Sequence, residues 1–233
     1  MGSWCASTHS PGWRRSSTEA AQLLVAPGAA LVALDPRSSR LIRWLVLLVD
    51  TAATPDGIVI EPLAIGEFDR FITYLNEHLA ENGSEEVGYF QPTSRGAPML
   101  PLAKTEAFRS GLGRAVSELG WRRAWVARQG AAFVGHIDLR ARPEPFTSHR
   151  CLLGMGVHRE CRRRGLAGRL LAVATAWAVE TTGLDWIDLE VLSTNVPAVR
   201  FYEKSGFESV GEVPDLFRID GLGLGSRSMT KRL

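Results

Sequence analysis

The apolar run Cys151–Val157 restricts the fold more than any other feature of this sequence. A strand that is apolar on both faces belongs in the centre of a sheet that other elements cover on both sides. The strand pattern at Leu184–Leu192 alternates instead, with apolar residues on one side and Asp188 and Glu190 on the other. Apolar residues at helical spacing predict a helix over Leu166–Thr181, between these two strands.

The remaining patterns from Gly57 onward extend this sheet. We expect a strand at Ile58–Pro62, a helix with an apolar stripe from Ile65 to Leu79, a second helix from Phe108 to a closing Gly120, a hairpin of Trp121–Arg128 and Ala131–Arg140, a helix at Val196–Ser205, and two final strands, Phe207–Val213 and Gly225–Lys231, around a turn-rich loop. This order predicts a mixed α/β fold, a single sheet with helices on its faces.

Residues 1–56 differ in texture from the rest. They are rich in Ala, Ser, Pro and Gly, although Ser38–Asp50 favours a short helix. We expect a poorly ordered N-terminal extension here, with a docking segment as the alternative, and one domain over residues 57–233. The apolar stretch after Arg14 and Arg15 is interrupted by polar residues and proline, which argues against a secretory signal. No run reaches the ~20 apolar residues that a membrane helix needs.

Composition excludes several functional classes. The 233 residues are 45% apolar with a formal net charge of +2, which is unlike a disordered chain and argues against a general nucleic-acid binder. The three cysteines form neither a disulfide framework nor a zinc pattern. We therefore expect a cytoplasmic protein without a metal.

The loop that follows the central strand is rich in arginine and glycine. Five arginines stand against one acidic residue over His158–Arg169: Arg159, Arg162, Arg163, Arg164 and Arg169. Gly165 and Gly168 allow close approach of the backbone, and the first amides of a helix lack intrahelical acceptors, so the loop is suited to bind phosphate. The alternative is a solvated basic turn. The glycine spacing matches neither a Walker loop nor a dinucleotide fingerprint.

A second motif lies 28 residues past Ala167, at Asn195-Val-Pro-Ala-Val-Arg-Phe-Tyr-Glu-Lys-Ser-Gly-Phe207. Together with Arg162-x-x-Gly165-x-Ala167, it resembles the GNAT acetyltransferase superfamily over about residues 57–233. The resemblance implies a mostly antiparallel sheet of about six to seven strands with about four helices, and acetyl-CoA as co-substrate. The chain departs from the usual pattern at Arg159, where proline is frequent, and at Arg163, where glycine is frequent.

The resemblance also implies roles for individual residues. The expected coenzyme-binding residues are Met155, Gly156, Val157, Arg162, Arg163, Arg164, Gly165, Leu166, Ala167, Gly168 and Asn195. Tyr202 is the candidate general acid, with a core tyrosine as the alternative. Glu190 is the candidate general base, and Asp188 on the same strand face competes with it. A solvent-facing structural role is the alternative for either carboxylate.

These expectations lead to one preferred function and two rivals. We expect direct transfer of acetyl from acetyl-CoA to a primary amine, of a small molecule, a protein N-terminus or a lysine, with no nucleic-acid or membrane partner. A non-catalytic acyl-CoA sensor is the first rival and a nucleic-acid-binding module is the second. Glu81, Glu85 and Glu86 would form an acidic lip for a cationic amine, or else a solvated loop. The resemblance allows a homodimer and leaves the acceptor open.

Overall fold

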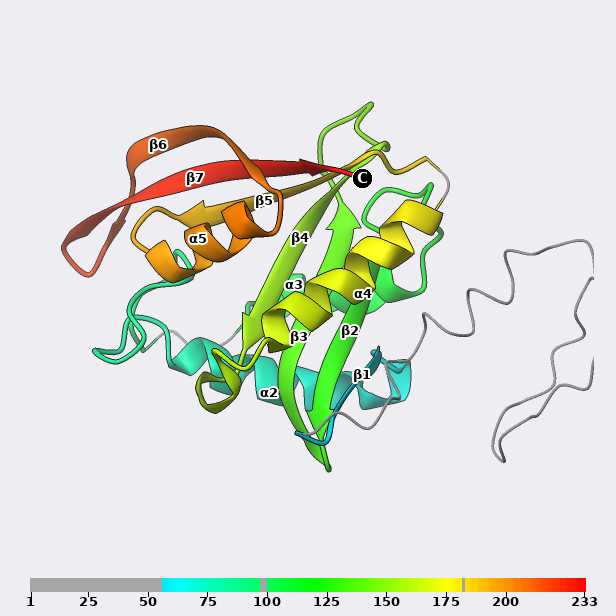
Figure 1. Cartoon of the computed structure of the whole chain (residues 1–233), viewed down its shortest axis with the longest axis horizontal. Helices are drawn as coiled ribbons and strands as arrows, with labels where there is room; N and C mark the ends of the chain where they lie inside the picture. Colours follow the sequence, from blue (N-terminus) through cyan, green and yellow to red (C-terminus); the bar gives the residue numbers. More distant parts are fainter. Residues whose placement is uncertain (1–55, 97–99, 182) are drawn as a thin grey trace, which may run out of the picture. The chain divides into compact units, whose positions relative to one another are not determined.

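One continuous sheet organises the part of the chain that this computed structural model describes, residues 56–96, 100–181 and 183–233 (Figure 1). Its seven strands lie in the order β1-β2-β3-β4-β5-β7-β6. The strands are β1 (Ile58–Pro62), β2 (Arg122–Gln129), β3 (Ala132–Ala141), β4 (Arg150–Val157), β5 (Trp186–Leu192), β6 (Glu208–Ile219) and β7 (Leu222–Arg232). Every neighbouring pair is antiparallel except β4 and β5, which are parallel.

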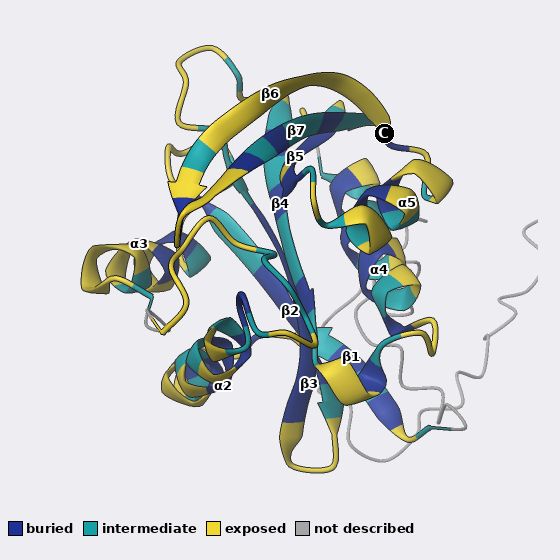
Figure 2. Cartoon of the chain, turned by 90° about the vertical axis from the view of Figure 1, so that its left-hand side faces the viewer, coloured by how far each residue is buried: buried dark blue, intermediate teal, exposed yellow. Residues whose placement is uncertain are grey.

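Helices cover both faces of the sheet (Figure 2). One face carries α2 (Phe68–Ala80) and α3 (Leu102–Leu112), and the other carries α4 (Leu166–Glu180) and α5 (Val196–Lys204). Single-turn 3-10 helices, η1 (Ile65–Glu67) and η2 (Arg159–Cys161), precede α2 and α4. The predicted class is therefore confirmed: a mixed, mostly antiparallel sheet of seven strands flanked by four helices in the described residues.

Strand alternation divides the side chains between two layers. Odd-numbered residues of β3, β4 and β5, such as Ile137, Leu153 and Leu189, join α4 and α5 in the main apolar core. Helices α2 and α3 bury a second, aromatic-rich cluster against β2. The even-numbered residues, including Asp188 and Glu190, lie on the α2 and α3 side. One face of the sheet is thus apolar across its centre, whereas the other carries ionisable groups.

The second helix is shorter than the sequence predicts, because α3 ends at Leu112 rather than at Gly120. A Cβ added at Gly111 would lie 2.6 Å from the carbonyl oxygen of Gly120, so the chain turns back against the helix at this point. The apolar residues Val116 and Leu119 continue the helical spacing by coincidence and lie in the connecting loop.

The last two strands are longer than predicted and meet in a tight turn at Asp220-Gly221, where both residues have positive φ. The prediction ended the first of them at Val213 and placed a turn-rich loop after it. The β6–β7 register is irregular between Val213 and Phe217, and this irregularity accommodates Pro214 without ending the strand.

Two sequence predictions cannot be compared with the structure. The helix at Ser38–Asp50 and the extension over residues 1–56, apart from Asp56, lie outside the described residues. Within the described ranges, no helix has the length and apolar character needed to cross a membrane.

Candidate active site

The strands β4 and β5 pair over a short stretch only and then separate. They pair from Arg150 to Leu152 on β4, and beyond that point β4 keeps its partner only on the β3 side (Figure 1). The amide of His158 donates to Val134 of β3, so by the two-residue period the backbone groups of Met155 and Val157 face the opposite, open edge. An extended ligand can pair with such an edge.

The arginine-glycine loop leads from this edge to the N-terminus of α4. Gly165 occupies the N-cap position with φ of +80° and offers no side-chain cap, so within the described ranges the first amides of the 15-residue helix have no hydrogen-bond acceptor. These amides belong to Leu166, Ala167 and Gly168. Arg163 has φ of +62°, a conformation that glycine adopts without strain, which gives a physical reason for glycine being frequent at this position.

The loop arginines divide into partnered and unpartnered groups. Arg159 forms ion pairs with Glu86 at 3.0 Å and Glu81 at 3.6 Å. Arg162 donates through Nε to the carbonyl oxygen of Val157 at 3.0 Å, and its Nη2 lies 3.9 Å from Glu81. The acidic residues Glu81 and Glu86 therefore face the arginine loop.

Arg169 donates to the carbonyl oxygen of Ile58 at 2.8 Å. Arg163 and Arg164, by contrast, are exposed and have no side-chain partner among the described residues. An anion at the α4 N-terminus would meet their guanidinium groups without displacing an existing ion pair.

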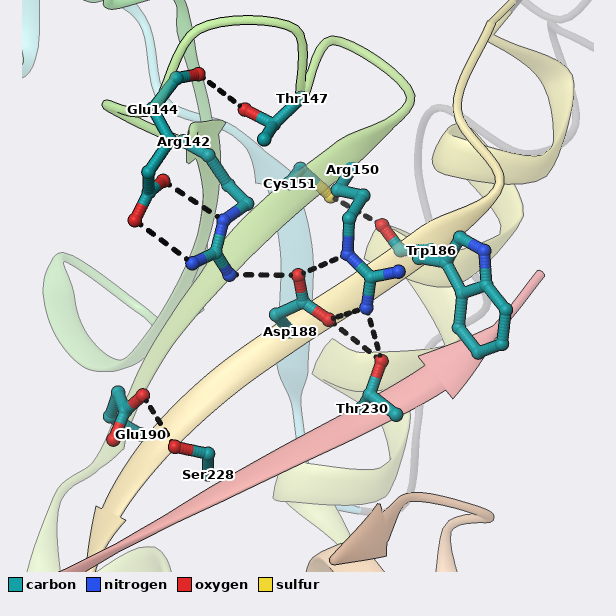
Figure 3. A network of polar contacts seen from close by, with 10 residues as sticks. All are labelled: Arg142, Glu144, Thr147, Arg150, Cys151, Trp186, Asp188, Glu190, Ser228 and Thr230. Carbon is teal, nitrogen blue, oxygen red and sulfur yellow. Dashed lines mark hydrogen bonds and ion pairs between the residues drawn. The ribbon is translucent and has the colours of Figure 1, made fainter. Parts of the chain in front are cut away.

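Asp188 is held in a buried polar network (Figure 3). Its carboxylate accepts hydrogen bonds from Arg142 at 2.9 Å, Arg150 at 2.8 Å and Thr230 at 2.7 Å. Burial alone would raise the pKa of Asp188, but the hydrogen bonds from Arg150, Thr230 and Arg142 lower it overall. This carboxylate is a fixed anion that ties together three neighbouring strands and the loop after β3.

Glu190 lies two residues further along the same face and has different surroundings. Its exposed carboxylate accepts hydrogen bonds from the hydroxyls of Ser226 at 3.0 Å and Ser228 at 2.8 Å. Figure 3 shows Glu190 apart from the Asp188 network. No cationic side chain pairs with Glu190 in the part of the chain that is described. Of the two carboxylates, Glu190 is the one whose charge is left uncompensated.

Tyr202 lies in α5, on the opposite face of the sheet. The side chain of Asn195 caps this helix by accepting a hydrogen bond from Ala198 at 3.3 Å. The Tyr202 ring packs between Phe201 and Phe207, and burial raises the pKa of its hydroxyl. That hydroxyl has no hydrogen-bond partner within the described ranges. Tyr202 and Glu190 can serve one ligand only through the opening between β4 and β5.

A buried histidine pair lies beside the candidate coenzyme strand, and sequence reasoning assigned it no role. A Cβ added at Gly156 would lie 2.5 Å from His136 and 2.6 Å from His78, so only glycine fits there. Nδ1 of His136 lies 3.1 Å from the Tyr74 hydroxyl, whereas Nδ1 of His78 is buried without a partner. Burial lowers the pKa of His78 to about 3 and that of His136 to about 4, so both rings are neutral at pH 7.

Two further observations concern the surroundings of the site. The described residues contain no group of three or more side chains that could hold a metal ion. A cavity of about 260 Å³ lies at the Arg150 end of β4, away from the arginine-glycine loop.

The chain matches the Acetyltransferase (GNAT) family over residues 98–207. It is 32% identical over 78 residues to the L-amino acid N-acetyltransferase AaaT of Escherichia coli, a match that covers 34% of this chain and 48% of that protein, about half its length. It is 26% identical to the uncharacterized N-acetyltransferase YycN of Bacillus subtilis over 67% of this chain and 96% of that protein.

Solved structures resemble the fold as well. A GNAT-family acetyltransferase from Streptococcus pneumoniae superposes with a TM-score of 0.62 at 21% identity, over 76% of this chain and 99% of that one. The family match includes the α4 N-terminus and the Asn195 motif, the two features on which the resemblance was based. Over residues 98–207 the chain thus matches the GNAT acetyltransferase family, and its fold is that of GNAT acetyltransferases.

Proposed function

We propose that this protein transfers the acetyl group of acetyl-CoA directly to a primary amine. The observation that carries the proposal is the parting of β4 from β5, which leaves a backbone edge leading to the uncapped N-terminus of α4. Acetyl-CoA supplies the acetyl group as a thioester, and the described residues suit both its extended arm and its phosphates.

Residues on this path would hold the co-substrate. The backbone of Met155 and Val157, beside Gly156, would pair with the extended arm. The amides of Leu166, Ala167 and Gly168, the turn at Gly165 and the free side chains of Arg163 and Arg164 would bind the pyrophosphate. Arg162 would act through the loop, since its guanidinium is bonded to Val157, and Asn195 would act by capping α5.

The chemistry needs a base, an oxyanion donor and an acid. Glu190 would accept a proton from the acceptor ammonium through a water, because a free alkylammonium with a pKa of ~10.4 is not nucleophilic. An amide on the open edge of β4 would polarise the thioester carbonyl. The Tyr202 hydroxyl would donate a proton to the leaving thiolate.

Direct transfer is supported by the state of the cysteines. Burial raises the pKa of the Cys151 thiol to about 12, so this thiol is not an available nucleophile at neutral pH. Cys161 is also buried, and both thiols are free. Free thiols in this part of the chain also support a cytoplasmic location.

Three coarser assignments belong to the same proposal. We assign the acetyltransferase domain to residues 57–233, on the ground that the sheet begins at Ile58, and residues 1–56 to an extension. The amine acceptor is supported by the match to the GNAT family and by the name of the Escherichia coli relative, an L-amino acid N-acetyltransferase. A homodimer through the final strands stays a prediction.

A thiol-release assay with acetyl-CoA and a panel of amines tests the proposal. We expect CoA release that depends on both acetyl-CoA and an amine. Coenzyme binding without turnover on any amine would favour the acyl-CoA sensor. A salt-dependent complex with random duplex DNA that CoA does not displace would favour the nucleic-acid-binding module.

A further inference from the structure

Three charged groups on the polar face of the sheet leave one positive charge uncompensated. Arg122 and Arg140 both approach the same oxygen of Asp138, at 3.3 and 3.2 Å. Arg122 also lies over the ring of Phe108, 4.0 Å from its centroid, and is the more buried of the two arginine side chains. Arg140 has no other side-chain partner in the described residues. The surplus positive charge therefore belongs to Arg140, whose side chain is 34% exposed.

The structure brings this guanidinium onto the backbone of β4. Asp138 is opposite Gly154 in the β3–β4 register. A Cβ added at Gly154 would lie 2.6 Å from the Asp138 carboxylate and 3.0 Å from Nη1 of Arg140. The absence of a side chain at Gly154 lets Arg140 reach the strand one residue before Met155, where the open edge begins.

A neighbouring arginine, just after the end of β3, shows the opposite arrangement. Arg142, two residues after Arg140, bonds both Glu144 and Asp188. Asp188 takes Arg150 as its second cation, so these two arginines face two carboxylates and their charges balance. Imbalance is thus a property of the Arg140 position and not of the neighbouring arginines in general.

The matching negative charge lies across β4. Glu190 on β5 has two hydroxyl partners and no cation among the described residues. Arg140 is opposite Leu152 on β4, and Leu152 is opposite Asp188 on β5, so Glu190 lies two residues further toward the opening. The guanidinium of Arg140 leans the same way along β4, because it reaches Gly154.

We propose that the acceptor is a free α-amino acid, whose carboxylate binds Arg140 while its amine is presented to Glu190. The inference rests on the proposed acetyl transfer and names the acceptor class for it. A polyamine would place another cation near Arg140, and a protein N-terminus would bring an amide carbonyl in place of the carboxylate. The guanidinium fork suits a carboxylate, which it can bind through two parallel hydrogen bonds.

The test compares three acceptors that share one side chain: L-phenylalanine, L-phenylalaninamide and phenethylamine. For the unmodified protein we expect kcat/KM to be roughly tenfold to a hundredfold higher for the amino acid than for either analogue, the range of one charged hydrogen-bonded contact. Arg140→Gln should remove this preference by lowering kcat/KM for the amino acid alone. Arg140→Lys should restore part of it, because lysine keeps the charge but not the fork.

Arg142→Gln is the matched control, since it removes a neighbouring arginine whose charge is already balanced. It should leave the ratio between amino acid and amine unchanged. Arg140→Gln leaves Asp138 paired with Arg122, so thermal unfolding and CoA binding of this variant should match those of the unmodified protein.

The outcomes distinguish a failure of the amino-acid inference from a failure of the proposed acetyl transfer. Equal turnover of the amino acid and phenethylamine, or an Arg140→Gln variant that slows both equally, overturns the inference while acetyl transfer stands. If no amine is turned over, acetyl transfer fails, and calorimetry of L-phenylalanine binding with CoA present decides the rest. If L-phenylalanine binds and Arg140→Gln abolishes this binding, the carboxylate site at Arg140 is retained. If L-phenylalanine does not bind, the carboxylate site is overturned.

Discussion

The two halves of β5 carry carboxylates on the same face, two residues apart, with opposite degrees of pairing. In the half that pairs with β4, Asp188 is buried and bonded to two guanidiniums and a hydroxyl. In the half beyond the parting, Glu190 is exposed and bonded to hydroxyls. Both residues carry a carboxylate, and both lie on the same strand face. The difference teaches that the state of pairing separates a structural carboxylate from one available for chemistry.

The same contrast recurs around the opening. The Tyr74 hydroxyl is bonded to His136, whereas the Tyr202 hydroxyl has no partner in the described part of the chain. Arg162 is bonded to a backbone carbonyl, whereas Arg163 and Arg164 are free of such contacts in the same ranges. Substitutions can test the partnered and the unpartnered member of each comparison separately.

The largest effect is expected for Glu190→Gln. Glutamine keeps the shape of the side chain, and its carbonyl oxygen can accept from one of the two serine hydroxyls while its NH2 donates to the other, but it cannot take up a proton. We expect kcat to fall by roughly 10²- to 10⁴-fold with CoA affinity unchanged. The measurement is a pH–rate profile of thiol release. An acidic limb that survives in Glu190→Gln rules this residue out as the base.

Tyr202→Phe should lower kcat by on the order of 10²-fold while leaving CoA binding nearly intact, because the variant lacks the proton for the leaving thiolate. Tyr74→Phe is the matched control. It removes a bonded hydroxyl from another helix, so it should cost about 1 kcal/mol of stability and little turnover. Unchanged turnover in Tyr202→Phe would remove that residue from the mechanism.

Asp188→Asn should act on stability instead of chemistry. It removes the anion that faces Arg142 and Arg150, and breaking such a buried pair costs roughly 3 kcal/mol. Urea unfolding at pH 7 measures this loss. Because the pKa of Asp188 is lowered in the fold, its stabilisation is present above the ordinary value of 3.8 and is lost as the pH falls through the lower folded value. The two proteins should therefore converge in stability in strong acid.

A variant Asp188→Asn that folds as stably as the unmodified protein at pH 7 but has lost turnover would contradict this assignment. It would return Asp188 to the position of candidate base and reverse the comparison between the two halves of β5.

Local signals predicted most of the fold and the outline of the site. The apolar run at β4, the glycines after the helices and the Asn195 cap each act within a few residues, and the structure agrees with them. The predicted extent of α3 was wrong because its end depends on Gly111 packing against Gly120, a contact that helical spacing does not encode.

Sequence reasoning could not separate Asp188 from Glu190, because alternation gives both the same face. The partners of Asp188 are 38 to 46 residues away in the sequence. Sequence reasoning left Glu81 and Glu86 as either an acidic lip or a solvated loop, and it did not reveal their ion pairs with Arg159. In both cases the deciding interaction joins distant segments, which composition and spacing do not reveal.

The buried histidine pair adds a pH dependence in a different range from that of Asp188. Below pH ~6.5 the unfolded chain binds protons on His78 and His136, whereas in the fold their pKa values are about 3 and about 4. Stability should therefore fall as the pH drops from about 6.5 toward 4, by roughly 1 kcal/mol per pH unit for each ring. Urea midpoints between pH 4.5 and 7 measure the slope.

His78→Gln should reduce that slope by about half, because one of the two neutral rings no longer contributes. His78 belongs to the comparison between partnered and unpartnered groups, because its Nδ1 is buried without a hydrogen-bond partner in the described residues while its ring faces Gly156. Stability that does not change with pH over this range would mean that these histidines are not held neutral by burial.

The smallest effects are expected in the arginine-glycine loop, where substitutions can distinguish the effect of backbone conformation from that of side-chain charge. Arg163→Gly relieves the strain of a positive φ, which should stabilise the fold by ~1 kcal/mol. The greater freedom of glycine in the unfolded chain offsets part of this gain. It also removes one guanidinium from the proposed anion site, so CoA should bind several-fold more weakly although the protein is slightly more stable. Arg164→Gln should weaken CoA binding similarly without the gain in stability. If neither variant changes CoA affinity, free arginines at this helix N-terminus do not bind the coenzyme, and a lack of partners there marks only a solvated turn.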